Sequence, residues 1–389
     1  MKTILRTFVG CTAILFGTAC MGAVKYVPEN MKVELSLKVP GNNAVNYKLH
    51  PDKLENSYFD YEWRSDNKLP ITVFHKVEER DSCMRLTVQL TAAQDVYFNY
   101  RQLLSTGYRH DNCQFYMPGF WYRRNLRSPK KAPSFHTSDS WLLREDRLSA
   151  PLTGIFSEKE KRFMTVNRLD DFSMDALATH KEGEIILSGK TSLGFTGFEN
   201  QQGIAMLSFG FPYREAPKSY IRKLTLAPEV EAFQLMKKGE SVLLTWEIME
   251  SGADDFSDFI QHTWEHCYDT YAPKPVENSY SIADMKQVLS CFFVNSLVDN
   301  QPLVYNSGIH LKVSDCERNG QAEVGFIGRV LLNAFNAWEY GWQSNREELK
   351  VNSTKIFDSY LKNGFTQAGF FKESVNFDKG YEEPIHSIR

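Results

Sequence analysis

The feature that most constrains the fold is a change of hydrophobic period near residue 250. From residue 24 to about residue 250, short alternating or β-branched runs recur, among them residues 31–40 (MKVELSLKVP) and 84–92 (MRLTVQLTA). Clusters of Gly, Pro, Asn and Asp separate these runs, which is typical of strands joined by turns. We therefore predict a large antiparallel β-sandwich over residues 24–250.

Helical spacing replaces the strand pattern after residue 251. Apolar residues at helical intervals predict helices over 254–271, 281–298, 323–341 and 346–364, and Pro384 suits the first turn of a fifth helix. Pro273 and Pro275 interrupt the pattern after the first of these helices. Residues 251–280 are thus expected to form a linker helix with a proline-containing connection, and residues 281–389 a helical domain.

The connections between these helices alternate in length. The one from Gly341 to Arg346 is short, whereas those before residue 323 and after residue 364 are each about twenty residues, a length that is usually functional. This alternation places both long connections on the same face of an array of helical hairpins. The helix beginning at Glu323 is apolar nearly all round, as an inner helix would be, and the next has a charged side.

A β-sandwich followed by alternating inner and outer helices resembles the six-hairpin glycosidases. The resemblance covers the mature chain in architecture, and residues 315–389 in the pattern of helix ends, where EVGFIGRVLLNAFNAWEYG looks like a first inner helix and PIHSIR like the start of a second. It implies a β-supersandwich, a partial (α/α)6 toroid over residues 281–389, and a pocket at the N-termini of the inner helices.

The resemblance also implies that the toroid is incomplete. The sequence stops at Arg389, just after the expected start of a second inner helix. We therefore expect a truncated and inactive chain. The alternative is a complete protein whose helices cap the sandwich by themselves.

Glycoside hydrolysis needs two carboxyl groups, one on each side of the scissile bond. The long connection before the inner helix supplies Asp315 and Glu317, and Glu323 begins that helix, so these three are the predicted catalytic residues. Arg329 and His386 are predicted to bind substrate. Asp315 and Glu317 also have a plainer interpretation as solvated loop charges. Glu323 has one as a carboxylate that complements the helix dipole, and Arg329 as a member of an internal ion pair.

A second cluster of interest lies in the sandwich, over residues 113–131. Trp121 and Tyr122 are flat rings on which sugars can stack, and the adjacent Arg123 and Arg124 can hold the carboxylates of an acidic glycan. The alternative is that the rings pack inside the protein and the charges belong to a solvated loop.

The N-terminus has the pattern of an export signal. Lys2 and Arg6 precede an apolar stretch, residues 8–16, that is too short to span a bilayer. Cys20 fits the acylated residue of a lipoprotein signal, and ordinary cleavage after Ala23 is the alternative. We expect an exported protein in the periplasm or at the outer membrane, attached to a membrane only through such a lipid.

Partners and cofactors follow from charge and spacing. A net charge of -3 argues against a nucleic-acid partner. The cysteines match no zinc spacing, and we interpret them as buried free thiols, with a Cys83–Cys113 bridge as the alternative. His262 and His266 lie four apart without a third ligand in the sequence, so no metal and no cofactor is expected.

These observations predict an exported, glycoside hydrolase-like protein that acts on a polysaccharide or oligosaccharide. One alternative is a non-catalytic carbohydrate-binding or scaffold protein that uses the sandwich alone. The other is a polysaccharide lyase, which the domain order disfavours because lyases of that kind generally place the toroid first.

Overall fold

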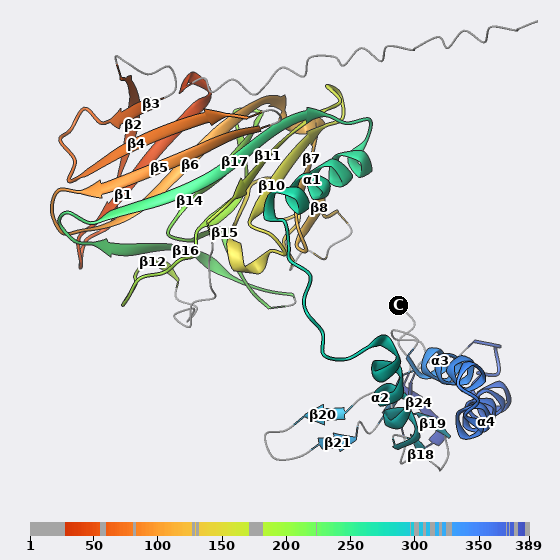
Figure 1. Ribbon diagram of the computed structural model, residues 1–389. Helices are drawn as coiled ribbons and strands as arrows, with labels where there is room; N and C mark the ends of the chain where they lie inside the picture. The colour runs from red at the N-terminus through yellow and green to blue at the C-terminus, as the bar shows by residue number, and fades with distance from the viewer. Residues whose placement is uncertain are drawn as a thin grey trace, which may run out of the picture. The chain divides into compact units, whose positions relative to one another are not determined.

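A computed structural model describes residues 28–54, 60–80, 83–126, 129, 132–170, 182–222, 224–295, 297–298, 303–305, 309–311, 316–318, 321–323, 329–370, 372, 374–376 and 380–385. The chain divides into two compact units, Met1–Pro273 and Lys274–Arg389. Strands dominate the first unit, and helices α2 to α4 belong to the second (Figure 1).

The described part of the first unit contains strands β1 to β17, which share one hydrogen-bonded framework, and helix α1. The strands are β1 (Met31–Lys38), β2 (Val45–Lys53), β3 (Asp60–Arg64), β4 (Ile71–Glu79), β5 (Cys83–Ala92), β6 (Val96–Arg109), β7 (Cys113–Met117), β8 (Trp121–Arg123), β9 (Trp141–Arg144), β10 (Leu152–Ser157), β11 (Arg162–Arg168), β12 (Gly183–Ile186), β13 (Phe195–Gln201), β14 (Ile204–Phe211), β15 (Arg214–Arg222), β16 (Thr225–Met236) and β17 (Ser241–Gly252).

These strands form two largely antiparallel layers, as the sequence predicts. One layer has the order β2-β3-β4-β5-β17-β11-β10-β7-β8. The other has the order β2-β1-β6-β14-β13-β9, and β2 takes part in both. Strand β16 pairs with the first residues of β6 in the second layer, and it also pairs with β15 and with β12, the last of these pairings being parallel.

The main core lies between the two layers. It is rich in large rings that are almost wholly excluded from water, among them Trp63, Trp121, Trp141, Tyr100 and Trp246. Burying one such side chain contributes about 1.5–3 kcal/mol, so this aromatic layer accounts for much of the stability of the sandwich.

Helix α1 (Phe256–Tyr271) covers the outer face of the β7–β10–β11–β17 region (Figure 1). Asp255 caps it by accepting hydrogen bonds from the backbone N–H groups of Ser257 and Asp258 at 2.7 and 2.9 Å. Phe256 and Phe259 pack against the sheet, so β10 is buried on both of its faces.

The described part of the second unit contains helices, two of which form a hairpin, and short strands. The helices are α2 (Ile282–Asn295), α3 (Arg329–Gln343) and α4 (Glu347–Asn363). The strands are β18 (Leu297–Val298), β19 (Val304–Tyr305), β20 (Ile309–Leu311), β21 (Cys316–Arg318), β22 (Gln321–Glu323), β23 (Ser374–Asn376) and β24 (Gly380–Ile385). The turn between α3 and α4 is short, as predicted, and contains Asn345 with a φ of 56°.

Helix α3 is not the fully buried inner helix that its composition predicts. The face of α3 that carries small side chains is buried, with Val330, Ala334 and Ala337 in the core of the unit. Phe335 and Trp342, on other faces of the helix, are exposed. The described part of the chain therefore confirms a β-sandwich followed by helices, and it does not confirm a toroid.

The fifth helix predicted at Pro384 is wrong, because Pro384 lies in strand β24 opposite Val375 of β23. Proline lacks an N–H group and is tolerated in a strand at an edge, and β24 is an edge strand of its small sheet. Within the described residues, no helix is long and apolar enough to cross a membrane.

Candidate functional site

A stripe of aromatic rings runs along one side of α1. Trp264, Tyr268 and Tyr271 follow the spacing i, i+4 and i+7, which places them on the same side of a helix. Their exposed fractions are 40%, 66% and 44%, unusually high for rings of this size beside a core. The neighbouring stripe, with Phe259 and Cys267, is buried against the sheet. The helix therefore holds the sandwich with one stripe and presents rings with the next.

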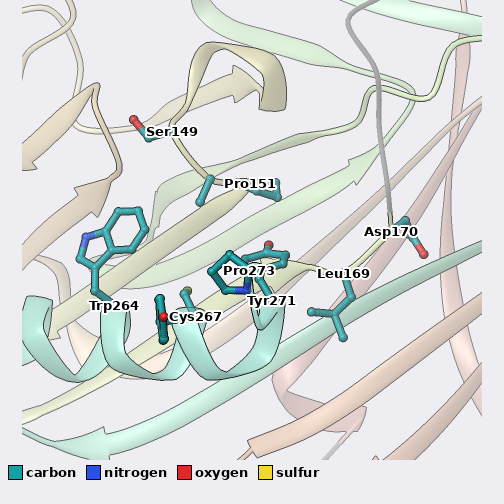
Figure 2. Close-up of a pocket in the computed structure, with 10 residues that line it drawn as sticks. Ser149, Pro151, Leu169, Asp170, Trp264, Cys267, Tyr271 and Pro273 are labelled. Atoms are coloured by element: carbon teal, nitrogen blue, oxygen red, sulfur yellow. The ribbon is translucent and has the colours of Figure 1, made fainter. Parts of the chain in front are cut away.

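These rings open on a cavity of about 430 Å³, which we call the α1 groove (Figure 2). Its lining consists of Ser149, Ala150, Pro151, Leu169, Asp170, Trp264, Cys267, Tyr268, Tyr271 and Pro273. The helix supplies one wall, and the segments that precede β10 and follow β11 supply the other. A concave, largely apolar surface with a few polar groups at its rim is the usual form of a small-molecule site.

Hydrogen bonds fix two of the three rings. The indole Nε1 of Trp264 donates to the hydroxyl of Tyr116 at 2.6 Å. The hydroxyl of Tyr271 donates to Asn167 Oδ1 at 2.7 Å and to the carbonyl of Arg168 at 3.0 Å, and burial raises the pKa of Tyr271. Both rings are therefore held in place before any ligand arrives.

Polar groups mark the two ends of the α1 groove, Ser149 at one and Asp170 at the other (Figure 2). Asp170 Oδ2 accepts from Arg168 Nε at 3.0 Å and from the backbone N–H of Thr245 at 2.8 Å. Its side chain keeps an exposed fraction of 25%. Asp170 is the one carboxylate among the described lining residues, and this lining contains neither Lys nor Arg.

Part of the cluster predicted at residues 113–131 lines a second cavity, of about 690 Å³. Tyr122, Arg123 and Arg124 all line it, and Tyr122 is half exposed, as a stacking ring must be. Arg123 has a φ of 58°, its guanidinium group donates to Gln114 Oε1 at 3.1 Å, and the same group lies 4.8 Å from the ring centroid of Phe256. The Arg123 side chain is thus already engaged in contacts with strand β7 and helix α1.

Two other members of this cluster are structural. Trp121 is fully buried and donates from Nε1 to the carbonyl of Arg123 at 2.9 Å, so its predicted role as an exposed stacking ring is wrong. Residues alternate between the two faces of strand β8, which turns Trp121 inward and Tyr122 outward. Arg124 donates to the carbonyls of Cys113 and Asp111 and covers the ring of Phe135.

Of the predicted catalytic carboxylates, the structure describes the backbone of Glu317 and Glu323, and both lie in short strands. Glu323 is the last residue of strand β22, so the expected start of a helix at Glu323 is wrong, and the described part of α3 spans Arg329–Gln343. Glu317 lies in β21, which pairs with β20 in a different small sheet. Asp315 and His386 lie outside the described residues, as do the side chains of Glu317, Glu323 and Arg329.

The two long connections meet in a short strand ladder, which the sequence analysis did not predict. Strand β22 in the first pairs with β23 in the second, and Glu323 stands opposite Ser374 in the register. This pairing supplies the edge on which β24 adds as a third strand. A long-range ladder of this kind leaves no local signal in the sequence.

The interpretation as buried free thiols is confirmed for three cysteines and is wrong for Cys291, and the side chain of Cys316 lies outside the described residues. Cys83, Cys113 and Cys267 are buried free thiols, and the alternative Cys83–Cys113 bridge is not formed. Burial raises the pKa of each of these thiols to about 12. Cys291 on α2 is free and exposed.

Comparison with known proteins gives no family. No family model matches the sequence, and no curated protein matches it either. Among solved structures, a polysaccharide lyase overlaps 86% of this chain and 54% of its own length, with 12% identity and a TM-score of 0.30. A galactose mutarotase-related enzyme from Lactobacillus acidophilus overlaps 57% of this chain and 79% of its own, with 10% identity and a TM-score of 0.30.

A third structure comes from Synechocystis sp. PCC 6803, with 7% identity, coverage of 56% of this chain and 73% of its own, and a TM-score of 0.29. The neighbours thus include carbohydrate-active proteins. At these TM-scores the overlaps do not establish a common fold, and those activities belong to the proteins that bear the names.

Proposed function

We propose that this chain is an exported carbohydrate-binding protein whose α1 groove holds a saccharide against Trp264, Tyr268 and Tyr271. The observation that carries the proposal is the stripe of three partly exposed rings along one side of a cavity. Faces of sugar rings carry C–H groups, and they pack well on flat aromatic surfaces that keep a polar edge in water.

The groove favours a neutral saccharide. Its one described carboxylate, Asp170, can accept from sugar hydroxyls, and the described lining has no cation to bind a uronic acid, since the nearby Arg168 is already paired with Asp170. The acidic glycan suggested by Arg123 and Arg124 finds less support, because both guanidinium groups already have partners within the protein.

The groove supports binding rather than cleavage. Hydrolysis of a glycosidic bond by the usual mechanism needs two carboxyl groups on opposite sides of that bond. The described lining of the α1 groove contains one. This favours the non-catalytic alternative for the first unit.

Affinity electrophoresis of the full chain against a panel of neutral and uronic-acid polysaccharides tests the proposal. Tyr268→Ala is expected to weaken binding of the retarding neutral polysaccharide about tenfold, equivalent to about 1.4 kcal/mol. Trp342→Ala, which removes a similarly exposed ring in the second unit, is the matched control. If Tyr122→Ala reduces retardation and Tyr268→Ala does not, the saccharide site belongs to the second cavity instead.

Glycoside hydrolysis in the second unit is a second candidate function. It is supported by the β22–β23 ladder, which joins two connections rich in acidic residues and includes Glu323. Glu323→Gln would abolish release of reducing sugar by a hydrolase and leave the retardation of a pure binding protein unchanged. An assay that detects no release from any retarding polysaccharide would rule this candidate out.

Export belongs to the same proposal, and its support is the sequence of the first residues. Lys2, Arg6 and the apolar residues 8–16 have the order of a secretory signal. Fractionation of expressing cells tests export, and Cys20→Ser tests lipid attachment, since only a lipoprotein would then leave the membrane fraction.

A further inference from the structure

Three potential metal ligands meet where α1 packs on the sandwich, outside both cavities. Cys83 begins β5, Glu247 lies in the adjacent strand β17, and His266 projects from α1. One ligand atom from each residue lies within 4.8 Å of the other two. The sequence separates these residues widely, so the sandwich and the helix must both form before the cluster exists.

Strand register explains how the sheet supplies two of these ligands. In the antiparallel ladder, Cys83 stands opposite Met249, and Glu247 stands opposite Arg85. Cys83 and Glu247 are therefore diagonal neighbours on the same face of two paired strands, within reach of each other. Helix α1 covers that face, and His266 on this helix supplies the third ligand, with Nε2 at 2.7 Å from Glu247 Oε1.

From this arrangement we propose that Cys83, Glu247 and His266 form a binding site for a zinc ion. Thiolate sulfur, imidazole nitrogen and carboxylate oxygen are the three donors that protein zinc sites use, with bonds of about 2.0–2.3 Å. Three protein ligands leave the fourth tetrahedral position to water. The charges balance, because a thiolate and a carboxylate together neutralise a divalent cation.

The surroundings suit such a site. Cys83 and Glu247 are buried among the apolar residues that anchor α1, while the His266 side chain is 21% exposed and leaves a route for an ion to enter. Arg85 Nη2 lies 3.7 Å from the other oxygen of Glu247, which orients the carboxylate from outside the ligand shell. Thiol and imidazole donors favour zinc over calcium or magnesium, which prefer oxygen ligands.

The competing interpretation is that the His266–Glu247 hydrogen bond simply docks α1. Metal titration of the untagged, full-length protein separates the two. We expect the parent to bind about one equivalent of Zn²⁺ in competition with a chromophoric chelator. Cys83→Ser and His266→Gln are each expected to weaken binding at least about tenfold.

Two control variants lie outside the cluster. His262→Gln changes an exposed histidine on the same helix, which pairs with Asp258 at 3.4 Å, and Cys291→Ser removes the exposed thiol of α2. Both are expected to bind Zn²⁺ as the parent does. If Cys83→Ser binds as tightly as the parent, the proposal is overturned.

Cobalt substitution keeps the proposal testable even if a variant fails to fold. Co²⁺ bound by Cys83 would give the parent protein a sulfur-to-cobalt charge-transfer absorption, which the Cys291→Ser variant should retain. A parent spectrum without that absorption at saturating Co²⁺ would overturn the assignment of the thiolate ligand. Circular dichroism of each variant without metal identifies those that are folded.

Discussion

The indole of Trp264 and the hydroxyl of Tyr116 share a hydrogen bond of 2.6 Å that ties α1 to strand β7. Tyr116 is nearly fully buried, and burial raises its pKa to about 12. The same indole contributes a face to the α1 groove. One side chain therefore serves both the attachment of the helix and the proposed binding surface.

Trp264→Phe separates these two roles. The variant keeps a ring at the groove and loses the donor to Tyr116, so we expect the free energy of unfolding to fall by about 1 kcal/mol while saccharide binding is largely retained. Trp264→Ala should lose both. Urea denaturation and affinity electrophoresis of the two variants provide the measurements, and equal loss of binding in both would contradict a stacking role for the ring.

The buried ion pair of Arg168 and Glu145 supports the segment that ends at the groove. Arg168 Nη1 donates to Glu145 Oε2 at 2.7 Å, both side chains are almost wholly buried, and the N–H of Gly194 donates to the same oxygen at 2.7 Å. Arg168→Met leaves a buried carboxylate without its cation. We expect a loss of about 3–5 kcal/mol in the free energy of unfolding.

The control for that prediction removes the second charge as well. Arg168→Met combined with Glu145→Gln should recover most of the loss, because the amide oxygen can still accept from Gly194 and no buried charge remains. Arg162→Met, which breaks a partly exposed pair with Glu250, should cost much less. A double variant as unstable as the single one would show that packing, rather than charge, dominates at this position.

Local periodicity explains what the sequence predicted well. The change near residue 250 follows directly from the difference between strand and helix spacing, and α1 and α4 begin and end within two residues of their predicted bounds. The alternation in strand β8 also gave a usable signal, since adjacent Trp121 and Tyr122 must face opposite sides. The prediction erred there by treating both rings as one exposed surface.

Long-range pairing explains what the sequence did not predict. Pro384 has the local character of a helix start, but β24 is held by its ladder with β23. The meeting of Cys83, Glu247 and His266 likewise depends on strand register and helix docking, neither of which is encoded locally. The sequence analysis did not identify the rings of the α1 groove as a site, and only the structure separates their exposed stripe from the buried stripe beside it.

Thiol reactivity should follow burial closely. Cys113 and Cys267 are buried, which raises the pKa of each thiol to about 12, whereas Cys291 is exposed. Because the thiolate is the reactive species, iodoacetamide at neutral pH should modify Cys291 in the native protein and leave Cys113 and Cys267 unmodified. Peptide mass spectrometry before and after unfolding in urea measures this. Early modification of Cys267 would show that α1 opens readily from the sheet.

His75 is expected to make the sandwich sensitive to acid. It lies fully buried between Trp63 and Tyr100, with Nε2 at 2.9 Å from the Tyr100 hydroxyl, and burial lowers its pKa from 6.5 to about 3. The folded state therefore keeps His75 neutral at pH values where the unfolded chain binds a proton. Above pH 6.5 the residue adds no pH dependence, and as the pH falls from about 6.5 toward 3 the unfolded state gains stability.

The expected slope is a loss of about 1.4 kcal/mol in the free energy of unfolding per pH unit across that interval. Urea denaturation of the full chain at a series of pH values from neutral to about pH 4 measures it. His75→Gln removes the titrating group, so the free energy of unfolding of this variant should fall less steeply with acid than that of the parent, by about 1.4 kcal/mol per pH unit. His50→Gln, which changes an exposed histidine, is the matched control. If the His75→Gln and parent proteins lose stability in parallel, proton uptake by His75 in the unfolded state does not govern the acid response.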